Sequence, residues 1–91
     1  MKYYINKRIL EKDTNETYEL TFLEGKFLAS FRDEKTMLYS QLCEKVYDIE
    51  CDSLEDALKE IKSKVTKKYG IEFKTRYKIG YVLITNIEFI Y

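Results

Sequence analysis

The chain has 91 residues, of which 45% are hydrophobic and 35% charged, and its 16 basic and 16 acidic side chains give a formal net charge of zero. Its nine Tyr and five Phe exclude a disordered chain, and its length predicts a single globular domain over residues 1–91. The absence of His excludes His-based catalytic triads and argues against a zinc site, and no apolar run is long enough for a membrane-spanning helix.

The first forty residues have the composition and alternation of β-strands. Residues 2–10, KYYINKRIL, are followed by the polar run EKDTNE and then by YELTFLEGKFLASF, which begins at Tyr18. Glu24-Gly25 separates two apolar stretches, and Gly permits the positive φ that a tight hairpin requires. We therefore expect an N-terminal three-stranded antiparallel meander.

Residues 33–45, DEKTMLYSQLCEK, fit two interpretations. Asp33 could cap a short helix, yet part of the segment also alternates as a strand does. We favour a short helix near 34–44. The next residues alternate strictly, with Tyr47, Ile49 and Cys51 on one face, and this predicts a strand whose other face is solvated.

The clearest element is a helix over about 53–69. Ser53 is a suitable N-cap, and Gly70 stands at the position of a C-terminal glycine. Between them, apolar residues recur every three or four positions. These are Leu54, Ala57, Leu58, Ile61 and Val65. We expect this apolar stripe to pack on the sheet.

Residues 71–91 predict two strands with a turn or bulge at Gly80. Most odd positions are apolar and the even positions 72–78 are mostly charged, so we interpret the aromatic residues as core and the basic ones as a solvated face. At Val82 and Ile84 the even face is also apolar, which indicates a central strand covered on both faces. The complete prediction is an α+β domain: an antiparallel sheet of five or six strands with the 53–69 helix across one face.

Cys43 and Cys51 lie eight residues apart, and the N-terminus MKYYINKRIL lacks the pattern of a signal peptide. We therefore expect a cytoplasmic protein with two reduced thiols. No cofactor motif or metal-ligand spacing is present, so we expect a non-enzymatic protein without a cofactor or a bound metal.

Charge is distributed unevenly along the chain. Residues 1–12 hold four basic and one acidic residue, residues 13–52 hold four and ten, and residues 53–91 hold eight and five. An acidic surface in the middle of the chain could bind a protein with a basic surface, although a solvated strand face is the plainer interpretation. Its candidate residues are Asp48, Glu50, Asp52, Glu55 and Asp56.

A nucleic-acid-binding face is the alternative. Its candidate residues are Lys2, Lys7, Arg8, Lys74, Arg76 and Lys78. A stacking surface for bases needs aromatic and basic side chains on one exposed face, whereas here the two kinds alternate along the strand.

Glu72-Phe73-Lys74 resembles the second half-motif of PD-(D/E)xK nucleases. The resemblance implies carboxylates that hold Mg²⁺ and a Lys that positions water. The Pro-Asp half of the motif is missing, because the chain contains no Pro. A nuclease is therefore a remote alternative.

The functional hypothesis is a small non-enzymatic module that binds a protein partner through its acidic strand face, and a homodimer is compatible with these features. A short chain rich in Lys, Ile and Tyr also resembles the small proteins of phages and mobile elements, many of which inhibit host defence proteins, as anti-CRISPR proteins do. This resemblance rests on size and composition and not on a motif.

Overall fold

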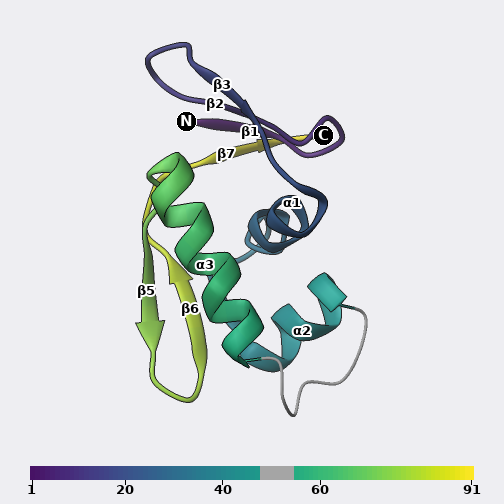
Figure 1. Cartoon of the computed structure of the whole chain (residues 1–91), viewed down its shortest axis with the longest axis vertical. Coiled ribbons are helices and arrows are strands. Elements are labelled where there is room, and N and C mark those ends of the chain that lie inside the picture. Colours follow the sequence, from purple (N-terminus) through teal and green to yellow (C-terminus); the bar gives the residue numbers. More distant parts are fainter. Residues whose placement is uncertain (48–54) are drawn as a thin grey trace.

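The computed structural model describes residues 1–47 and 55–91, which form three helices and seven strands in two sheets (Figure 1). The molecule measures 39 × 22 × 22 Å. Figure 1 shows the four-stranded sheet at one end of the long axis, and the β5–β6 hairpin running alongside α3 toward the other end. The α+β class is confirmed, whereas the single antiparallel sheet of five or six strands with one long helix is not.

The four-stranded sheet has the order β3-β2-β1-β7. Its strands are β1 (Lys2–Tyr4), β2 (Ile9–Glu11), β3 (Thr17–Glu19) and β7 (Glu88–Ile90). β1, β2 and β3 are antiparallel neighbours, but β7 joins β1 in parallel, with Phe89 opposite Tyr3. The N-terminal meander therefore exists, but it is complete by residue 19, because the expected first strand is divided by a turn in which Arg8 has φ 54°.

Helix α1 (Phe22–Ala29) occupies the place of the expected hairpin at Glu24-Gly25. Thr21 is its N-cap, and Thr21 and Glu24 form a capping box in which each side chain accepts a hydrogen bond from the other residue's backbone N–H. Phe27 and Leu28 are fully buried. The hairpin prediction was wrong because the capping box starts a helix here, and the buried residues Glu24, Phe27, Leu28 and Phe31 recur at helical spacing and not at every second position.

The second sheet has the order β4-β6-β5, with both pairs antiparallel. Its strands are β4 (Thr36–Leu38), β5 (Phe73–Arg76) and β6 (Gly80–Leu83). Helix α2 (Tyr39–Tyr47) follows β4 directly, so the segment 33–45 contains both a strand and a helix. Gly80 permits the close approach of β4, because a Cβ atom there would overlap the carbonyl oxygen of Met37.

Helix α3 (Glu55–Tyr69) confirms the predicted helix within the described residues. Leu58, Ile61 and Val65 are buried, and Gly70 ends the helix with φ 71°. α3 packs against α1 and α2. Beside it, Phe27, Phe31, Phe73 and Tyr81 form a cluster of edge-on and tilted ring contacts with centroids 5.2–6.1 Å apart.

Three expectations need correction. Val46 and Tyr47 belong to α2 and not to a strand, and the remainder of the predicted acidic strand lies outside the described residues. β6 is central in its sheet, yet Ile84 just beyond it is 52% exposed and is not covered on both faces as expected. Cys43 is buried and disulfide-bonded, so the prediction of reduced thiols is wrong for it; Cys51 lies outside the described residues.

Among the described residues, no helix has both the length and the apolar character required to cross a membrane.

We predict that Leu58→Ala lowers the free energy of unfolding by about 2–5 kcal/mol, because Leu58 is fully buried and its loss leaves a cavity between α3 and the core. Denaturant unfolding of the full chain measures this effect. Lys59→Ala, at the exposed neighbouring position, is the control and should change stability by less than about 0.5 kcal/mol. Equal effects of the two substitutions would contradict the packing described for α3.

Candidate nucleic-acid interface

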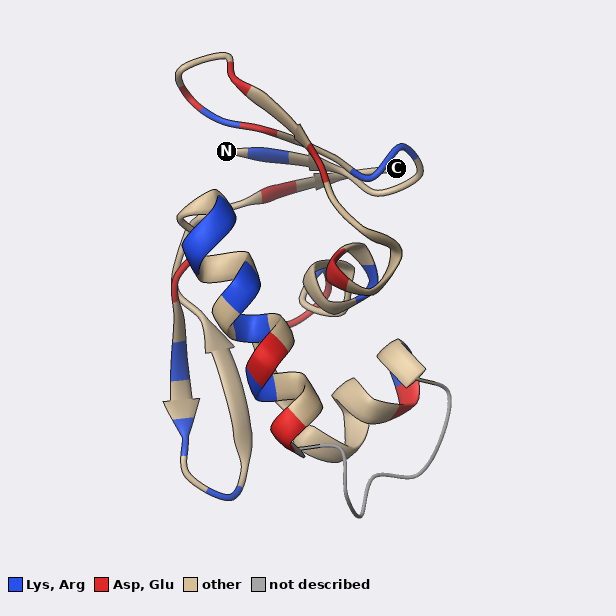
Figure 2. Cartoon of the chain, in the orientation of Figure 1, with Lys and Arg blue, Asp and Glu red and all other residues tan. Residues whose placement is uncertain are grey.

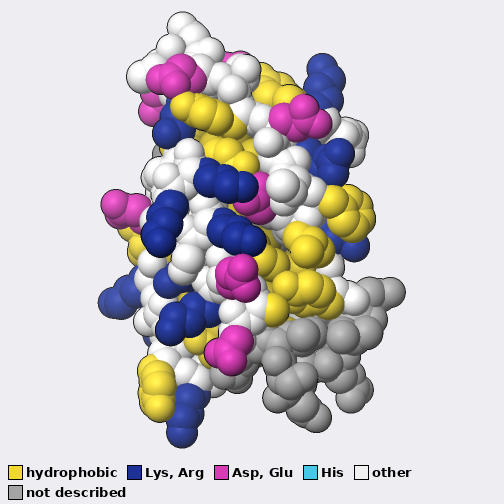
Figure 3. Space-filling view, viewed as in Figure 1, with side chains coloured by type: hydrophobic (Ala, Val, Ile, Leu, Met, Phe, Trp, Pro, Cys, Tyr) yellow, Lys and Arg dark blue, Asp and Glu magenta, His cyan; other side chains and the backbone are white. Residues whose placement is uncertain are grey.

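A basic surface extends over α3 and the β5–β6 hairpin (Figures 2 and 3). Residues 59–78 hold eight Lys or Arg and two Glu. Within the described part of the chain, six of these cations take part in no ion pair. We define the basic surface by these six: Lys59, Lys62, Lys67, Lys74, Arg76 and Lys78.

The helical period places the three α3 members on one side of the helix. Lys59, Lys62 and Lys67 fall within a single arc of the helix surface, because each residue advances by about 100°. Lys68 lies on the other side, where it forms an ion pair with Glu24 of α1. The three lysines therefore lie toward the hairpin, and the exposed β5 side chains continue the charge around the free edge of the second sheet.

Lys62 links the helix to the hairpin. Its ammonium donates a hydrogen bond to Thr75 Oγ1 at 3.3 Å and lies 5.3 Å from the ring centroid of Tyr81. Phe73 anchors the same face of β5 near its start, with its ring centroid 5.4 Å from that of Phe27. Phe73 and Thr75 therefore face the helices, and Lys74 and Arg76 are exposed on the opposite face of the strand.

A groove of about 300 Å³ lies between α3 and the hairpin. Phe73 and Ile84 provide apolar surface, and Lys62 and Lys67 provide positive charge. Ser63, Thr66 and Glu72 also line it. The groove can accept a small apolar group next to an anion, which is the combination that a nucleotide presents.

The tip of the hairpin is the part of this region that sequence patterning missed. Tyr77 was expected in the core but is 82% exposed, and Ile79 is exposed beside it. Lys78 turns the chain with φ 60° and lies 5.4 Å from the centre of the Tyr77 ring. β5 ends at Arg76, so Tyr77 and Ile79 do not continue the alternation that places Phe73 partly in the core.

The structure describes little of the predicted acidic surface. Asp48, Glu50 and Asp52 lie outside the described residues, as does the side chain of Glu55, and only Asp56 is seen, exposed near the start of α3. A protein partner for an acidic face remains a prediction.

The structure divides the predicted basic residues between two ends of the molecule. Lys7 and Arg8 lie in the β1–β2 turn of the four-stranded sheet, whereas Lys74, Arg76 and Lys78 lie on the hairpin (Figures 1 and 2). The two groups therefore do not form one continuous patch, and only the hairpin group joins the basic surface.

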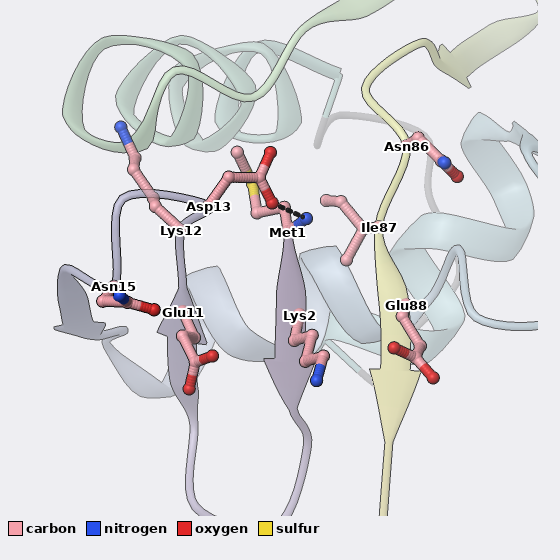
Figure 4. Close-up of a pocket in the computed structure, with 9 residues that line it drawn as sticks. All are labelled: Met1, Lys2, Glu11, Lys12, Asp13, Asn15, Asn86, Ile87 and Glu88. Atoms are coloured by element: carbon pink, nitrogen blue, oxygen red, sulfur yellow. Dashed lines mark hydrogen bonds and ion pairs between the residues drawn. The ribbon is translucent and has the colours of Figure 1, made fainter.

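Lys2 belongs to neither group. It lies between Glu11 and Glu88 of the neighbouring strands and lines a recess of about 430 Å³ (Figure 4). In the same recess the Met1 ammonium forms a 2.8 Å ion pair with Asp13. Positive and negative groups alternate there, so the recess does not extend the basic surface.

For the remote nuclease alternative, Lys74 lies on β5 and Glu72 precedes it. Among the described residues, no group of three or more acidic or sulfur side chains is placed to hold a metal ion.

A buried carboxylate, Glu24, connects α1 to the end of α3. It accepts hydrogen bonds from the Tyr69 hydroxyl at 2.8 Å, the Lys68 ammonium at 3.0 Å and the Thr21 backbone N–H at 3.0 Å. Burial alone would raise the pKa of Glu24, but these hydrogen bonds and the charge of Lys68 together hold the pKa below its ordinary value of 4.5. Glu24 is therefore ionised at neutral pH.

We predict that Glu24→Gln destabilises the protein at neutral pH by about 1–3 kcal/mol, because an amide leaves part of this hydrogen-bond set unmade. A carboxyl group whose pKa is lowered by folding stabilises the fold at pH values above its ordinary pKa of 4.5. This contribution to stability disappears as the pH falls through the lower pKa of the folded state. Denaturant unfolding across this range should show the two proteins converging in acid. Glu60→Gln, in the exposed pair with Lys64, is the control, and a constant difference at every pH would refute the linkage.

Comparisons with known proteins identify no relative. No family model, no characterised protein and no solved structure matches the chain. The chemistry of its surfaces is therefore the basis for a functional assignment.

Proposed function

We propose that the protein is a nucleic-acid-binding module that contacts the phosphate backbone through the basic surface. The observation that carries the proposal is the gathering on α3 and the β5–β6 hairpin of six cations that pair with no acid among the described residues, in a chain whose formal net charge is zero. Phosphates attract such unpaired cations, and the release of counterions makes the association favourable.

The order of elements supports this proposal. α2 and α3 are consecutive helices followed by a hairpin, which is the order of a helix-turn-helix with an added β-hairpin wing. In DNA-binding proteins of this kind the second helix lies against the major groove. The likeness is one of element order only, because residues 48–54, between α2 and α3, lie outside the described residues.

The charge along α3 favours backbone contacts over base reading. In a helix-turn-helix the first residues of the second helix contact base edges. Here Asp56 is exposed near that end, and Glu60 follows it on the helix surface, so phosphates are disfavoured there. The cations lie from Lys59 onward and on the hairpin. We therefore propose binding that is largely independent of base sequence.

A protein-binding module with an acidic face remains the competing hypothesis. Charge reversal separates the two: substitution of Asp48 and Glu50 by Lys should abolish binding to a basic protein and leave or strengthen binding to nucleic acid. Reversal of Lys74 and Arg76 should have the opposite effects.

We predict salt-dependent binding to a short DNA duplex and to the corresponding single strand, measured by fluorescence anisotropy. If all six cations contact phosphates, the slope of log K against log salt is about −5 for the duplex, and Lys74→Gln with Arg76→Gln reduces its magnitude by about 2. The affinity should fall to a similar extent for unrelated base sequences.

The control is the pair Lys2→Gln and Lys45→Gln, which removes the same charge from exposed positions outside the basic surface. It should leave the slope nearly unchanged. Binding without salt dependence, or equal effects of the two double variants, would overturn the proposal.

A further inference from the structure

A second cavity lies on the other side of the molecule from the hairpin, between the β1–β2 turn and α1. Its volume is about 490 Å³, within the range of small-molecule sites. Its wall is mainly apolar, with two cations and one amide. The lining residues are Tyr3, Ile5, Asn6, Arg8, Phe22, Gly25, Lys26 and Ala29.

The Tyr3 hydroxyl is the feature of this cavity that indicates a ligand. Tyr3 is fully buried, and its hydroxyl is the buried side-chain polar atom of the described residues that has no hydrogen-bond partner. Burial raises the pKa of Tyr3 to about 12, against the opposing charge of Arg8, so the hydroxyl keeps its proton at neutral pH and can donate. Native proteins rarely leave such a group unpaired.

The surroundings of the hydroxyl explain how a ligand could reach it. It lies against Gly25 and the aliphatic part of Arg8, since a Cβ atom on Gly25 would be 2.7 Å from the hydroxyl and 3.2 Å from Arg8 Cγ. Tyr3, Gly25 and Arg8 all line the cavity, and Arg8 is the flexible side chain among them. Arg8 also holds a φ of 54°, which is unfavourable for a residue with a side chain and is often retained where a site requires it.

The mouth of the cavity is cationic and aromatic. The Arg8 guanidinium lies 5.9 Å and the Lys26 ammonium 4.6 Å from the ring centroid of Phe22, and Phe22 is itself 58% exposed. Neither cation has an ion pair within the described residues. The cavity thus offers a hydrogen-bond donor at its apolar depth and two unpaired cations at its entrance.

We propose that this cavity binds a nucleotide. The base enters the apolar part, where a ring nitrogen or carbonyl oxygen accepts the hydrogen bond of Tyr3, and the phosphate is bound by Arg8 and Lys26. A free nucleotide and a nucleotide of a nucleic-acid strand offer the same chemistry. The site is separate from the basic surface and does not depend on the function proposed for it.

The test is calorimetric titration of the full chain with AMP, inorganic phosphate and an oligodeoxyadenylate. Tyr3→Phe should weaken AMP binding about 3- to 10-fold, because it removes one hydrogen bond. It should leave the denaturant midpoint equal or higher, since the hydroxyl has no partner in the protein. Arg8→Gln should weaken binding about tenfold or more.

Lys7→Gln is the matched control: it removes the same charge from the same turn, outside the cavity, and should change affinity by less than about twofold. Lys74→Gln with Arg76→Gln should not affect AMP binding. If AMP binds with these responses, the site takes free nucleotides; if only the oligonucleotide does, the site takes a nucleotide of a strand.

Three results would overturn the proposal. The first is that neither AMP nor the oligonucleotide binds at millimolar concentration. The second is that Tyr3→Phe and Arg8→Gln leave binding unchanged. The third is that inorganic phosphate binds as tightly as AMP, since a nucleotide site must gain affinity from the base.

Discussion

The carboxylate of Glu24 is the contact on which the arrangement of the helices depends. It completes the cap of α1 through Thr21 and also accepts hydrogen bonds from the last two residues of α3, Lys68 and Tyr69. Tyr69 in turn packs edge-on against Tyr18, with centroids 5.8 Å apart. One side chain therefore fixes the start of one helix, the end of another and their distance from the four-stranded sheet.

This contact also determines where the hairpin lies. Gly70 ends α3 directly after Tyr69, and β5 begins three residues later at Phe73. The end of α3 is the starting point of the hairpin, so the position of the basic surface relative to α1 follows from the hydrogen bonds of Glu24. A buried charge of this kind is costly unless it is fully paired, and here three donors compensate for its burial.

Because the chain is neutral overall, the basic surface implies an acidic remainder. Several of the acids lie in and around β2 and β3, at the opposite end of the long axis from the hairpin (Figure 2). They include Glu11, Asp13, Glu16 and Glu19. These acids alternate with Lys2, Lys7, Arg8 and Lys12, so that end carries mixed charge, and a polyanion is attracted chiefly to the hairpin end.

Secondary structure is predicted most accurately from the sequence where one local pattern has no competing alternative. The apolar spacing of α3 and the glycine after it identify the helix, and the odd positions Ile71, Tyr81 and Leu83 are core as expected. α1 is missed because its residues satisfy two patterns at once, and the choice is made by the capping box together with the burial of Phe27.

The candidate sites are harder to predict, because they depend on contacts between distant segments. Basic residues near each end of the chain look alike in sequence, yet Arg8 belongs to a cavity with Phe22 and Lys26, and Arg76 belongs to the hairpin surface. The orphaned hydroxyl of Tyr3 has no signature in sequence. The hydroxyl is enclosed by β1, the β1–β2 turn and α1, and among the described residues none of them provides a hydrogen-bond partner for it.

The parallel pairing of β7 with β1 joins residues 88–90 to residues 2–4. Closing so large a loop is entropically costly, and contacts of this range form late in folding. Until β7 pairs with it, β1 is an unpaired sheet edge next to Tyr3, and such an edge can capture a strand from another chain. In the folded protein β7 covers that edge and becomes the edge strand of the sheet in its place.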